Sequence, residues 1–592
     1  MEKKNFAGGL RQCCVFLRWP RTRNLHVTPW ARHAILFWFS LVLFPDLAMA
    51  APGCLRPLSQ GSDKLSGDAS AYLSRFPHGA SKPSASNEVS KDSVLSYFYE
   101  PCSFALAWTS RGKPTPQAEA IVAAFDSAPN KGLEAADYAA AQWKVRTADL
   151  VKRPGTPEEI ASFDLDLTVD LLQYLADLAA GRIGSQQKDA PFRSQADIES
   201  LLRIIASDFV SGTDIQRSIE SVEPSAEGYR GAKAALQHYL DLAKSPDVRL
   251  PRFESTVLPG KDPAYIEAIA GRLKQLGFLE SGLELKSPTF ERELVSAVRR
   301  FQELHGLGVT GNLDRDTYQE LAVPIRKRAE QLALTLERWR WVQHSFPEPP
   351  IVINIPEFKL RAFDEQTKVA LSMRVIVGKA YRRQTPVFQS SISSIVFHPY
   401  WNVPRDIQVG EISPKVARDP QYLERNGFEV TNSKGNVVHS DSAAVAAGVH
   451  DGSLKVRQVP GNRNSLGLIK FVLPNTYGVY LHGTPAQVLF SKARRDFSHG
   501  CIRAENPAAL AVWILRHEQG WSRARIDETL AQGKTVSVAL KPEIPVLIVY
   551  GTAVAEPNGD VYFSRDIYGH DEPLQRAIER LSMNRLRQHG AR

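Results

Sequence analysis

The sequence lacks any apolar stretch of the length that a membrane crossing requires. Its leading apolar run, residues 34–44, holds eleven residues, whereas a transmembrane helix needs about 20, and no later segment is apolar enough. The hydrophobic share of 43% is ordinary for a globular protein. The composition therefore argues against both a polytopic membrane protein and a wholly disordered chain. At 592 residues, the chain is long enough for several domains.

The run at residues 34–44 is instead typical of a secretory signal. Seven Lys and Arg residues lie within residues 1–32, Pro45 interrupts the run, and Ala48-Met49-Ala50 supplies the small residues of a cleavage site. We therefore expect residues 1–50 to be a signal peptide that directs export. The alternative is that the segment stays uncleaved and anchors the protein in the inner membrane.

A strong net charge is also lacking once residues 1–50 are set aside. The remainder carries 66 basic and 62 acidic residues, so the formal charge of +9 falls to about +4. A balance this mild gives no reason to expect nucleic acid as a partner.

Cysteine is scarce, with five residues in the chain. Cys13 and Cys14 lie in the expected signal peptide. Cys54 and Cys102 are candidates for a disulfide in an oxidising compartment, and the sequence does not decide whether they pair. Cys501 is left as an odd thiol in an exported protein, and reactivity is the natural explanation for such a thiol.

The pattern of apolar residues predicts a multidomain α+β protein. Leu294, Val298 and Phe301 repeat the i, i+4, i+7 spacing of a helix, and Asp314 is a candidate N-cap. Short β-branched runs such as residues 351–355 predict strands farther along the chain. The expected parts are a flexible lead-in (51–93), a helical scaffold (94–258), a three-helix module (259–324), a linker helix (325–349), a β-rich mixed-sheet domain (350–541) and a C-terminal part with two strands and a helix (542–592).

One long segment interrupts the β-rich domain. Residues 405–465 are polar and irregular in pattern, and loops of that length in a compact domain are usually lids or binding loops. We therefore expect a capping loop at this position.

The residues that carry chemistry gather between positions 480 and 503. Val479 and Leu481 alternate with Tyr480 and His482, so on a strand the last two share one face. If Val479 and Leu481 face the core, His482 lies at the strand end with its ring toward a cleft.

Ser498-His499-Gly500-Cys501 follows shortly afterwards, and Asn506-Pro507 predicts that a helix begins just after the cysteine. A cysteine attacks as the thiolate, and its free pKa of about 8.5 leaves little thiolate near neutrality. A neighbouring histidine takes the proton, and Arg503 and the helix start stabilise the anion. Gly500 lets its own N–H and that of Cys501 point at a developing oxyanion.

Two other interpretations of these residues remain. In the first, Cys501 is a buried thiol and the histidines have structural roles only. The other is a zinc site with His482, His499 and Cys501 as ligands, although no H-E-x-x-H pattern or carboxylate base accompanies them.

This constellation resembles the signature of the L,D-transpeptidase catalytic family, of the YkuD type. The resemblance rests on His482-Gly483-Thr484 and on Ser498-His499-Gly500-Cys501-Ile502-Arg503. Pro399-Tyr400-Trp401-Asn402 and Leu466-Gly467-Leu468-Ile469-Lys470 are similar to the long Gram-negative branch of that family. Residues 272–279 and 297–302, with Gly306 and Gly311, resemble the peptidoglycan-binding domain family. The branch combines a helical scaffold, such a binding domain and a capping loop in the catalytic domain.

The resemblance implies a role for each matched residue. Cys501 is the nucleophile, His482 the general base, and the Gly483 carbonyl orients the His482 ring. His499 shapes the oxyanion site or holds substrate, and Gly500 belongs to the same catalytic turn. The expected substrate-binding residues are Arg503, Trp401, Tyr480, Ser498 and Thr484. Arg503 stands where many relatives have asparagine, and core packing is the alternative role for Trp401 and Tyr480.

The implied reaction needs no metal or other cofactor. The enzyme takes a peptidoglycan tetrapeptide stem as donor, expels D-alanine and forms a 3→3 cross-link in the periplasm of a Gram-negative bacterium. Carbapenem β-lactams are the expected inhibitors, and other proteins of cell-wall synthesis are candidate partners. An L,D-carboxypeptidase, an enzyme that makes or cleaves a lipoprotein–peptidoglycan bond, and a catalytically idle wall-binding protein remain as alternatives.

Overall fold

The computed structural model describes residues 64–76, 89–184, 197–261, 266–280, 290, 292–342, 346–381, 383–419, 421–438 and 443–590. The expected signal peptide and Cys54 lie outside these residues. None of the described helices combines the length and apolar character needed to span a bilayer.

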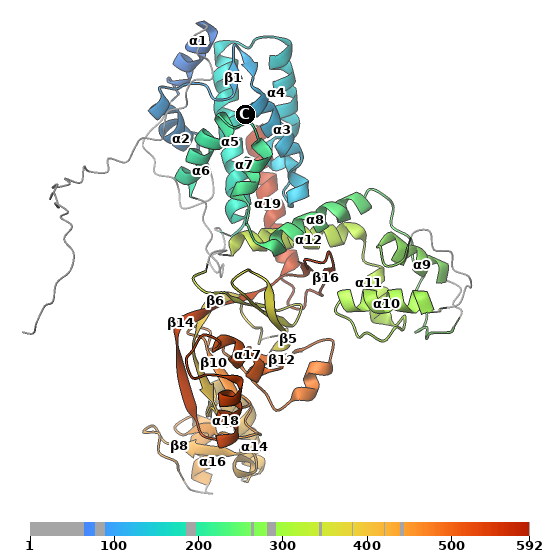
Figure 1. Cartoon of the computed structure of the whole chain (residues 1–592), viewed down its shortest axis with the longest axis vertical. Coiled ribbons are helices and arrows are strands. Elements are labelled where there is room, and N and C mark those ends of the chain that lie inside the picture. The colour runs from blue at the N-terminus through green and yellow to red at the C-terminus, as the bar shows by residue number, and fades with distance from the viewer. Residues whose placement is uncertain are drawn as a thin grey trace, which may run out of the picture. The chain divides into compact units, whose positions relative to one another are not determined.

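The first helical region is built around one long buried helix, α5 (Pro157–Ala180), near the N-terminal end of the colour ramp (Figure 1). Thr156 and Glu159 cap its start reciprocally, and Gly181 ends it at φ +78°. The buried Asp164 carboxylate accepts hydrogen bonds from the backbone amides of Ala107 and Trp108, at 2.7 and 2.9 Å. These bonds tie α5 to the preceding segment.

Shorter elements make up the rest of this helical part of the chain. They are α1 (Lys64–Leu73), α2 (Lys91–Val94), β1 (Thr109–Ser110), β2 (Lys113–Pro114), α3 (Pro116–Asp126), α4 (Ala140–Lys152), α6 (Ile198–Ile204), α7 (Ile215–Val222) and α8 (Glu227–Leu242), with 3₁₀ and π turns between several of them. Helix α1 differs from the flexible lead-in that we expected over residues 51–93. Its Ala69 and Leu73 are buried, so a short apolar stripe orders this part of the lead-in.

The three-helix module is present as the periodicity predicts. It consists of α9 (Ile266–Gln275), α10 (Arg292–Leu304) and α11 (Arg315–Leu321) around a core that includes Leu294, Val298 and Phe301. Asp314 caps α11 by accepting from the Thr317 amide at 2.8 Å. The linker helix α12 (Ile325–Trp341) follows.

The β-rich domain contains one nine-stranded mixed sheet in the order β12-β5-β13-β11-β10-β6-β14-β3-β4. Strand β4 also pairs with β5, so the sheet closes on itself like a barrel. The strands are β3 (Ile351–Asn354), β4 (Lys359–Phe363), β5 (Val369–Gly378), β6 (Phe388–Phe397), β10 (Ile469–Val472), β11 (Leu481–His482), β12 (Asp496–Ser498), β13 (Ile502–Ala504) and β14 (Val536–Val549). Helices α17 (Pro507–Ile514) and α18 (Arg523–Gln532) contribute to its core.

The interruption at residues 405–465 is a folded subdomain, and our expectation of an irregular loop is wrong. It contains α13 (Arg405–Ile407), the π-helical turn η6 (Gln408–Ile412), α14 (Ser413–Arg418), α15 (Tyr422–Arg425) and α16 (Ala443–Asp451). A small sheet of β7 (Trp401–Asn402), β9 (Lys455–Gln458) and β8 (Phe428–Thr431) joins them. Residues such as Ile412, Val430 and Val449 form a separate core. Because each element is so short, its periodicity is too brief to recognise in sequence. We call this segment the capping subdomain.

Strand β14 of the main sheet runs to Val549, so the boundary that we expected between residues 541 and 542 is wrong. Beyond this strand the chain has the predicted order of two strands and a helix. Strands β15 (Ala553–Ala555) and β16 (Val561–Phe563) pair across the turn at Asn558-Gly559, and α19 (Asp571–Gly590) follows.

Candidate active site

Three neighbouring strands place Lys470, His482 and Arg503 in one row. Lys470 on β10 is directly paired with His482 on β11, and His482 is directly paired with Arg503 on β13. Directly paired residues project from the same face of a sheet. Val479 and Leu481 are buried in the domain core on the other face, so His482 is oriented as the alternation predicts.

Cys501 lies on the same face as Arg503, two residues ahead of it. The turn that presents it is fixed by side chains. The Ser498 hydroxyl donates to the Cys501 carbonyl at 2.5 Å and accepts from the Gly500 amide at 3.2 Å. The Thr385 hydroxyl donates to the Gly500 carbonyl at 2.8 Å. Gly500 has φ +117°, a conformation that residues with a Cβ rarely adopt.

Helix α17 follows the cysteine as Asn506-Pro507 predicts, and the short strand β13 lies between them. The helix starts at Pro507, and its N-cap Asn506 accepts from the Ala509 amide at 3.0 Å. The cap was correctly predicted. The short strand was missed because three residues give too little alternation to detect.

The Cys501 sulfur is half-buried next to Tyr480. The thiol points toward the Gly478 carbonyl, with 3.9 Å between Sγ and the oxygen. Burial raises the pKa of the Cys501 thiol, while hydrogen bonds from the Tyr480 backbone and hydroxyl and the charges of Lys470 and Arg503 lower it. The net shift is upward. The sequence led us to expect a thiolate in the resting site, and burial instead favours the neutral thiol.

His482 is buried, with 4% of its surface exposed. Its Nδ1 lies 2.5 Å from the Gly483 carbonyl oxygen. A carbonyl only accepts, so Nδ1 carries the hydrogen and Nε2 of the neutral ring keeps its lone pair. Burial, and then the charge of Arg503, lower the pKa of His482 to about 3, with Lys470 acting in the same direction. The imidazole is therefore neutral at physiological pH.

Tyr480 connects the nucleophile to the capping subdomain. Its hydroxyl is hydrogen-bonded to the Trp401 side chain and to Cys501. The Lys470 ammonium lies 4.2 Å from the centroid of the Tyr480 ring, within cation–π range. Tyr480, expected at the substrate pocket, thus lies next to the sulfur, and Trp401, expected there too, contacts Tyr480.

His499 is bound to a carboxylate that the sequence gave no reason to select. Its Nε2 lies 2.5 Å from Oε1 of Glu411 in η6, and Arg383 forms an ion pair with the same oxygen at 3.2 Å. The ring of His499 therefore contacts the capping subdomain. Glu411 is 88 residues away in sequence, and nothing in the local pattern pairs the two.

Ser498 and Thr484, both expected to bind substrate, are buried and use their hydroxyls within the protein. Ser498 holds the catalytic turn, and Thr484 accepts from the Ala486 amide at 3.2 Å. Lys470 is the residue of the site that sequence reasoning did not select. Its position between the buried Ile469 and Phe471 is a signal that was available, because the alternation places it on the face opposite to the core.

The side chains proposed as zinc ligands are not arranged as a ligand set in the described residues. No group of three or more His, Cys, Asp or Glu side chains placed to hold a metal ion occurs in the described parts of the chain. The Nδ1 of His482 and the Nε2 of His499 each face a protein oxygen instead.

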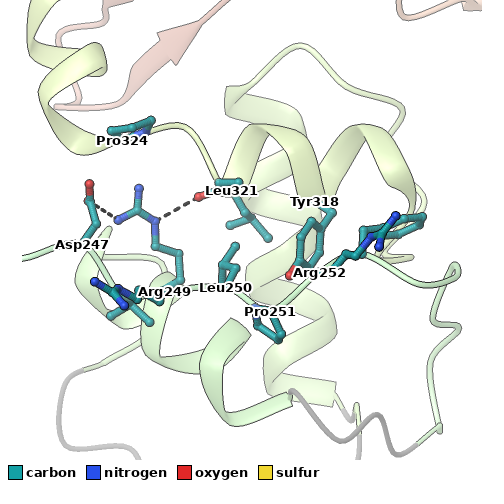
Figure 2. Close-up of a pocket in the computed structure, with 12 residues that line it drawn as sticks. Asp247, Arg249, Leu250, Pro251, Arg252, Tyr318, Leu321 and Pro324 are labelled. Carbon is teal, nitrogen blue, oxygen red and sulfur yellow. Dashed lines mark hydrogen bonds and ion pairs between the residues drawn. The ribbon is translucent and has the colours of Figure 1, made fainter.

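A separate pocket of about 480 Å³ lies in the three-helix module (Figure 2). Its lining comes from residues 247–253, from Arg272 and from the end of α11 through Pro324, and none of it from residues 470–503. Arg272 donates to Asp247 at 2.6 Å and to the Leu321 carbonyl at 3.0 Å, so this buried guanidinium holds the pocket wall together.

Comparison with known proteins matches this site to one family. Residues 349–538, which include the whole row and Cys501, match the family model of the L,D-transpeptidase catalytic domain. Within the chain, residues 349–538 are the part that is similar to L,D-transpeptidases. Residues 93–236 match a scaffold domain, and residues 264–321 match a family described as "Putative peptidoglycan binding domain".

Individual L,D-transpeptidases are similar to this chain to different degrees. A "Putative L,D-transpeptidase" of Haemophilus influenzae is 34% identical over 291 residues, which cover 48% of this chain and 58% of that protein. The match thus spans little more than half of the relative's length. The crystal structure of an L,D-transpeptidase (residues 123–326) from Xylanimonas cellulosilytica is 14% identical and covers 50% of this chain and 100% of the solved one. Its TM-score is 0.17, so it carries no structural argument.

Proposed function

We propose that this protein is an L,D-transpeptidase that forms 3→3 peptidoglycan cross-links through a thioester on Cys501, with a tetrapeptide stem as donor. The observation that carries the proposal is the row of Lys470, His482 and Arg503 beside Cys501 in the catalytic domain. It combines a nucleophile, a neutral base and two cations on one face of the sheet.

In the first half-reaction, the Cys501 sulfur attacks the carbonyl carbon at the L-centre of the third stem residue. The thiol proton passes to Nε2 of His482, which is available because Nδ1 faces the Gly483 carbonyl. The carbon–nitrogen bond then breaks, and the imidazolium returns the proton to the departing amine. The products are D-alanine and a thioester on Cys501.

In the second half-reaction, the side-chain amine of a neighbouring stem attacks the thioester. His482 takes the amine proton and returns it to the departing sulfur, so the thiol is regenerated and a new amide bond is made. Negative charge gathers on the carbonyl oxygen in both steps. The Cys501 amide is the oxyanion donor that we favour, because the Gly500 amide already donates to Ser498.

The low pKa of His482 means that the ring begins the reaction neutral. A ring with a pKa of about 3 is neutral before substrate arrives, and it accepts a proton only while the thiol loses one. The protonated ring is unstable beside Arg503 and Lys470, which favours its prompt return of the proton to the leaving group.

Product analysis tests the proposal. Purified protein is incubated with disaccharide-tetrapeptide, and the products are separated by chromatography and weighed. Transpeptidation yields a dimer that has lost one alanine, together with free D-alanine. Tripeptide without dimer would identify an L,D-carboxypeptidase, in which water replaces the amine. Unchanged substrate would contradict both activities.

We further propose that the protein works in the periplasm, where residues 264–321 hold it on the cell wall. The match of this module to a peptidoglycan-binding family supports the second part, and the signal-like residues 1–50 support the first. Cell fractionation tests the location. Co-sedimentation with purified sacculi, with and without residues 264–321, tests the binding.

A further inference from the structure

Two cations beside Cys501 have no acidic partner. Within the described residues, neither Lys470 nor Arg503 forms a salt bridge, and the Nε of Arg503 is buried without any hydrogen-bond partner. Two other arginines of the same domain are paired, Arg374 with Glu505 and Arg494 with Asp496 at 2.6 Å. Arg495 forms no salt bridge within the described residues, but its guanidinium donates to carbonyl oxygens such as that of Lys492. The active site therefore holds two positive charges that the described protein does not balance.

Such a pair is costly in a half-buried site unless a negative charge joins it. Burial removes water from both side chains, and it lowers the pKa of each of them. The Lys470 ammonium is in contact with the Tyr480 ring, which is only a weak partner. A carboxylate from outside the protein would offset one of the two positive charges and accept charge-assisted hydrogen bonds from both side chains.

We propose that Lys470 and Arg503 bind the C-terminal carboxylate of the donor stem, on the residue that the enzyme expels. This assignment rests on the proposed function and names the feature of the donor that its site recognises. The two residues are specificity determinants: they select stems in which the scissile bond is the last peptide bond.

The covalent geometry of a peptide fits this assignment. Three bonds, C–N, N–Cα and Cα–C, separate the attacked carbonyl carbon from the terminal carboxylate carbon, so the two lie within about 4 Å of each other. Neighbouring strands are about 4.8 Å apart, and Lys470 and Arg503 each lie one strand from His482. A carbonyl held over Cys501 therefore has its carboxylate within reach of both long side chains.

A stem with one more residue lacks this carboxylate. It has an uncharged amide at the same place, and the two cations remain unbalanced when it binds. A tetrapeptide is thus accepted and a pentapeptide rejected by charge, even though both contain the same scissile bond.

The test compares two donors that differ only in this charge. Purified protein is given a disaccharide-tetrapeptide with a free terminal carboxylate, or the same compound with a terminal carboxamide. The value of kcat/KM is measured from release of D-alanine or D-alaninamide. We expect the wild-type protein to prefer the acid by at least about tenfold, which corresponds to one charge-assisted contact.

Variants assign the preference to the two side chains. Lys470→Met and Arg503→Met should each reduce the acid-to-amide ratio severalfold, whereas Lys470→Arg should retain most of it. Lys534→Met is the matched control, because Lys534 is an exposed lysine of the same domain, and its ratio should equal that of the wild type. Any general damage to the fold or to Cys501 affects both donors and cancels in the ratio.

The outcomes separate this assignment from the proposed function. A wild-type ratio near one, or an unchanged ratio in both methionine variants, would overturn the carboxylate site while leaving transpeptidation intact. Failure of the wild type to release the terminal residue from either donor would overturn the proposed function and the assignment with it.

Discussion

His482 and Arg503 are directly paired on the neighbouring parallel strands β11 and β13, and Lys470 is paired with His482 from the other side. The imidazole thus lies between two cations, inside a buried site. Both features oppose its protonation, and the pKa of His482 falls to about 3. Because burial also raises the pKa of Cys501, the resting pair is a neutral thiol and a neutral imidazole. It is not the preformed ion pair that many cysteine enzymes use.

The first prediction concerns pH. A thiol whose pKa is raised above 9.0 gains thiolate only as pH rises through and beyond that value, and His482 does not titrate between pH 5 and 8. Alkylation of Cys501 by iodoacetamide should therefore accelerate continuously from pH 6 to above pH 9. Peptide mapping restricts the measurement to Cys501. A plateau between pH 6 and 8 would mean that the ion pair exists after all.

The second prediction concerns the base. His482→Asn keeps a polar side chain of similar reach but removes the proton acceptor, so acylation by tetrapeptide should slow by about 10²- to 10⁴-fold. Single-turnover mass spectrometry gives the rate, and circular dichroism checks the fold. A decrease in the acylation rate of less than tenfold would show that another group accepts the thiol proton.

The third prediction concerns Tyr480, whose hydroxyl is hydrogen-bonded to Cys501 and to the Trp401 side chain. Tyr480→Phe removes both bonds. At about 0.5–1.5 kcal/mol for a hydrogen bond, acylation should slow by roughly three- to tenfold, and the pKa of Cys501 should rise further. The control is Tyr477→Phe, because Tyr477 is 55% exposed. Equal effects in the two variants would show that Tyr480 does not interact with the Cys501 sulfur.

The fourth prediction concerns the contact between Glu411 and His499. Glu411→Gln replaces the carboxylate that holds the His499 ring and the Arg383 guanidinium, at 2.5 and 3.2 Å. Amide hydrogen exchange in residues 405–418 should become faster, because the capping subdomain loses a contact with the catalytic turn. Glu424→Gln changes an exposed carboxylate of the same subdomain and should leave exchange unaltered. Identical exchange in both variants would show that Glu411 does not hold the subdomain.

Much of the fold can be predicted from the sequence because the patterns that specify its elements involve only neighbouring residues. The alternation around Tyr480 and His482, the caps at Asp314 and Asn506 and the i, i+4, i+7 spacing in α10 each depend on a few neighbouring residues. The capping subdomain was missed since its elements are too short to show a period, and its core joins residues such as Ile412 and Val449 that lie far apart.

The residues of the site also fall into two groups, those that a local motif identifies and those that only the fold brings together. Cys501 and His482 stand in a contiguous motif and were identified from it. Lys470 joins them only through the register of β10 against β11, and Glu411 only through a contact with His499 across 88 residues. The pKa of the thiol depends on burial. Desolvation outweighs the nearby cations, and a linear motif contains no measure of it.

Intact mass spectrometry of the purified protein tests the central claim, that Cys501 carries the acyl group. After brief incubation with disaccharide-tetrapeptide, we expect one adduct with the mass of the disaccharide-tripeptide acyl group, mapped to Cys501, and free D-alanine in equal amount. Cys501→Ala should give neither. An adduct of the same mass in Cys501→Ala, or D-alanine release without that cysteine, would contradict the account.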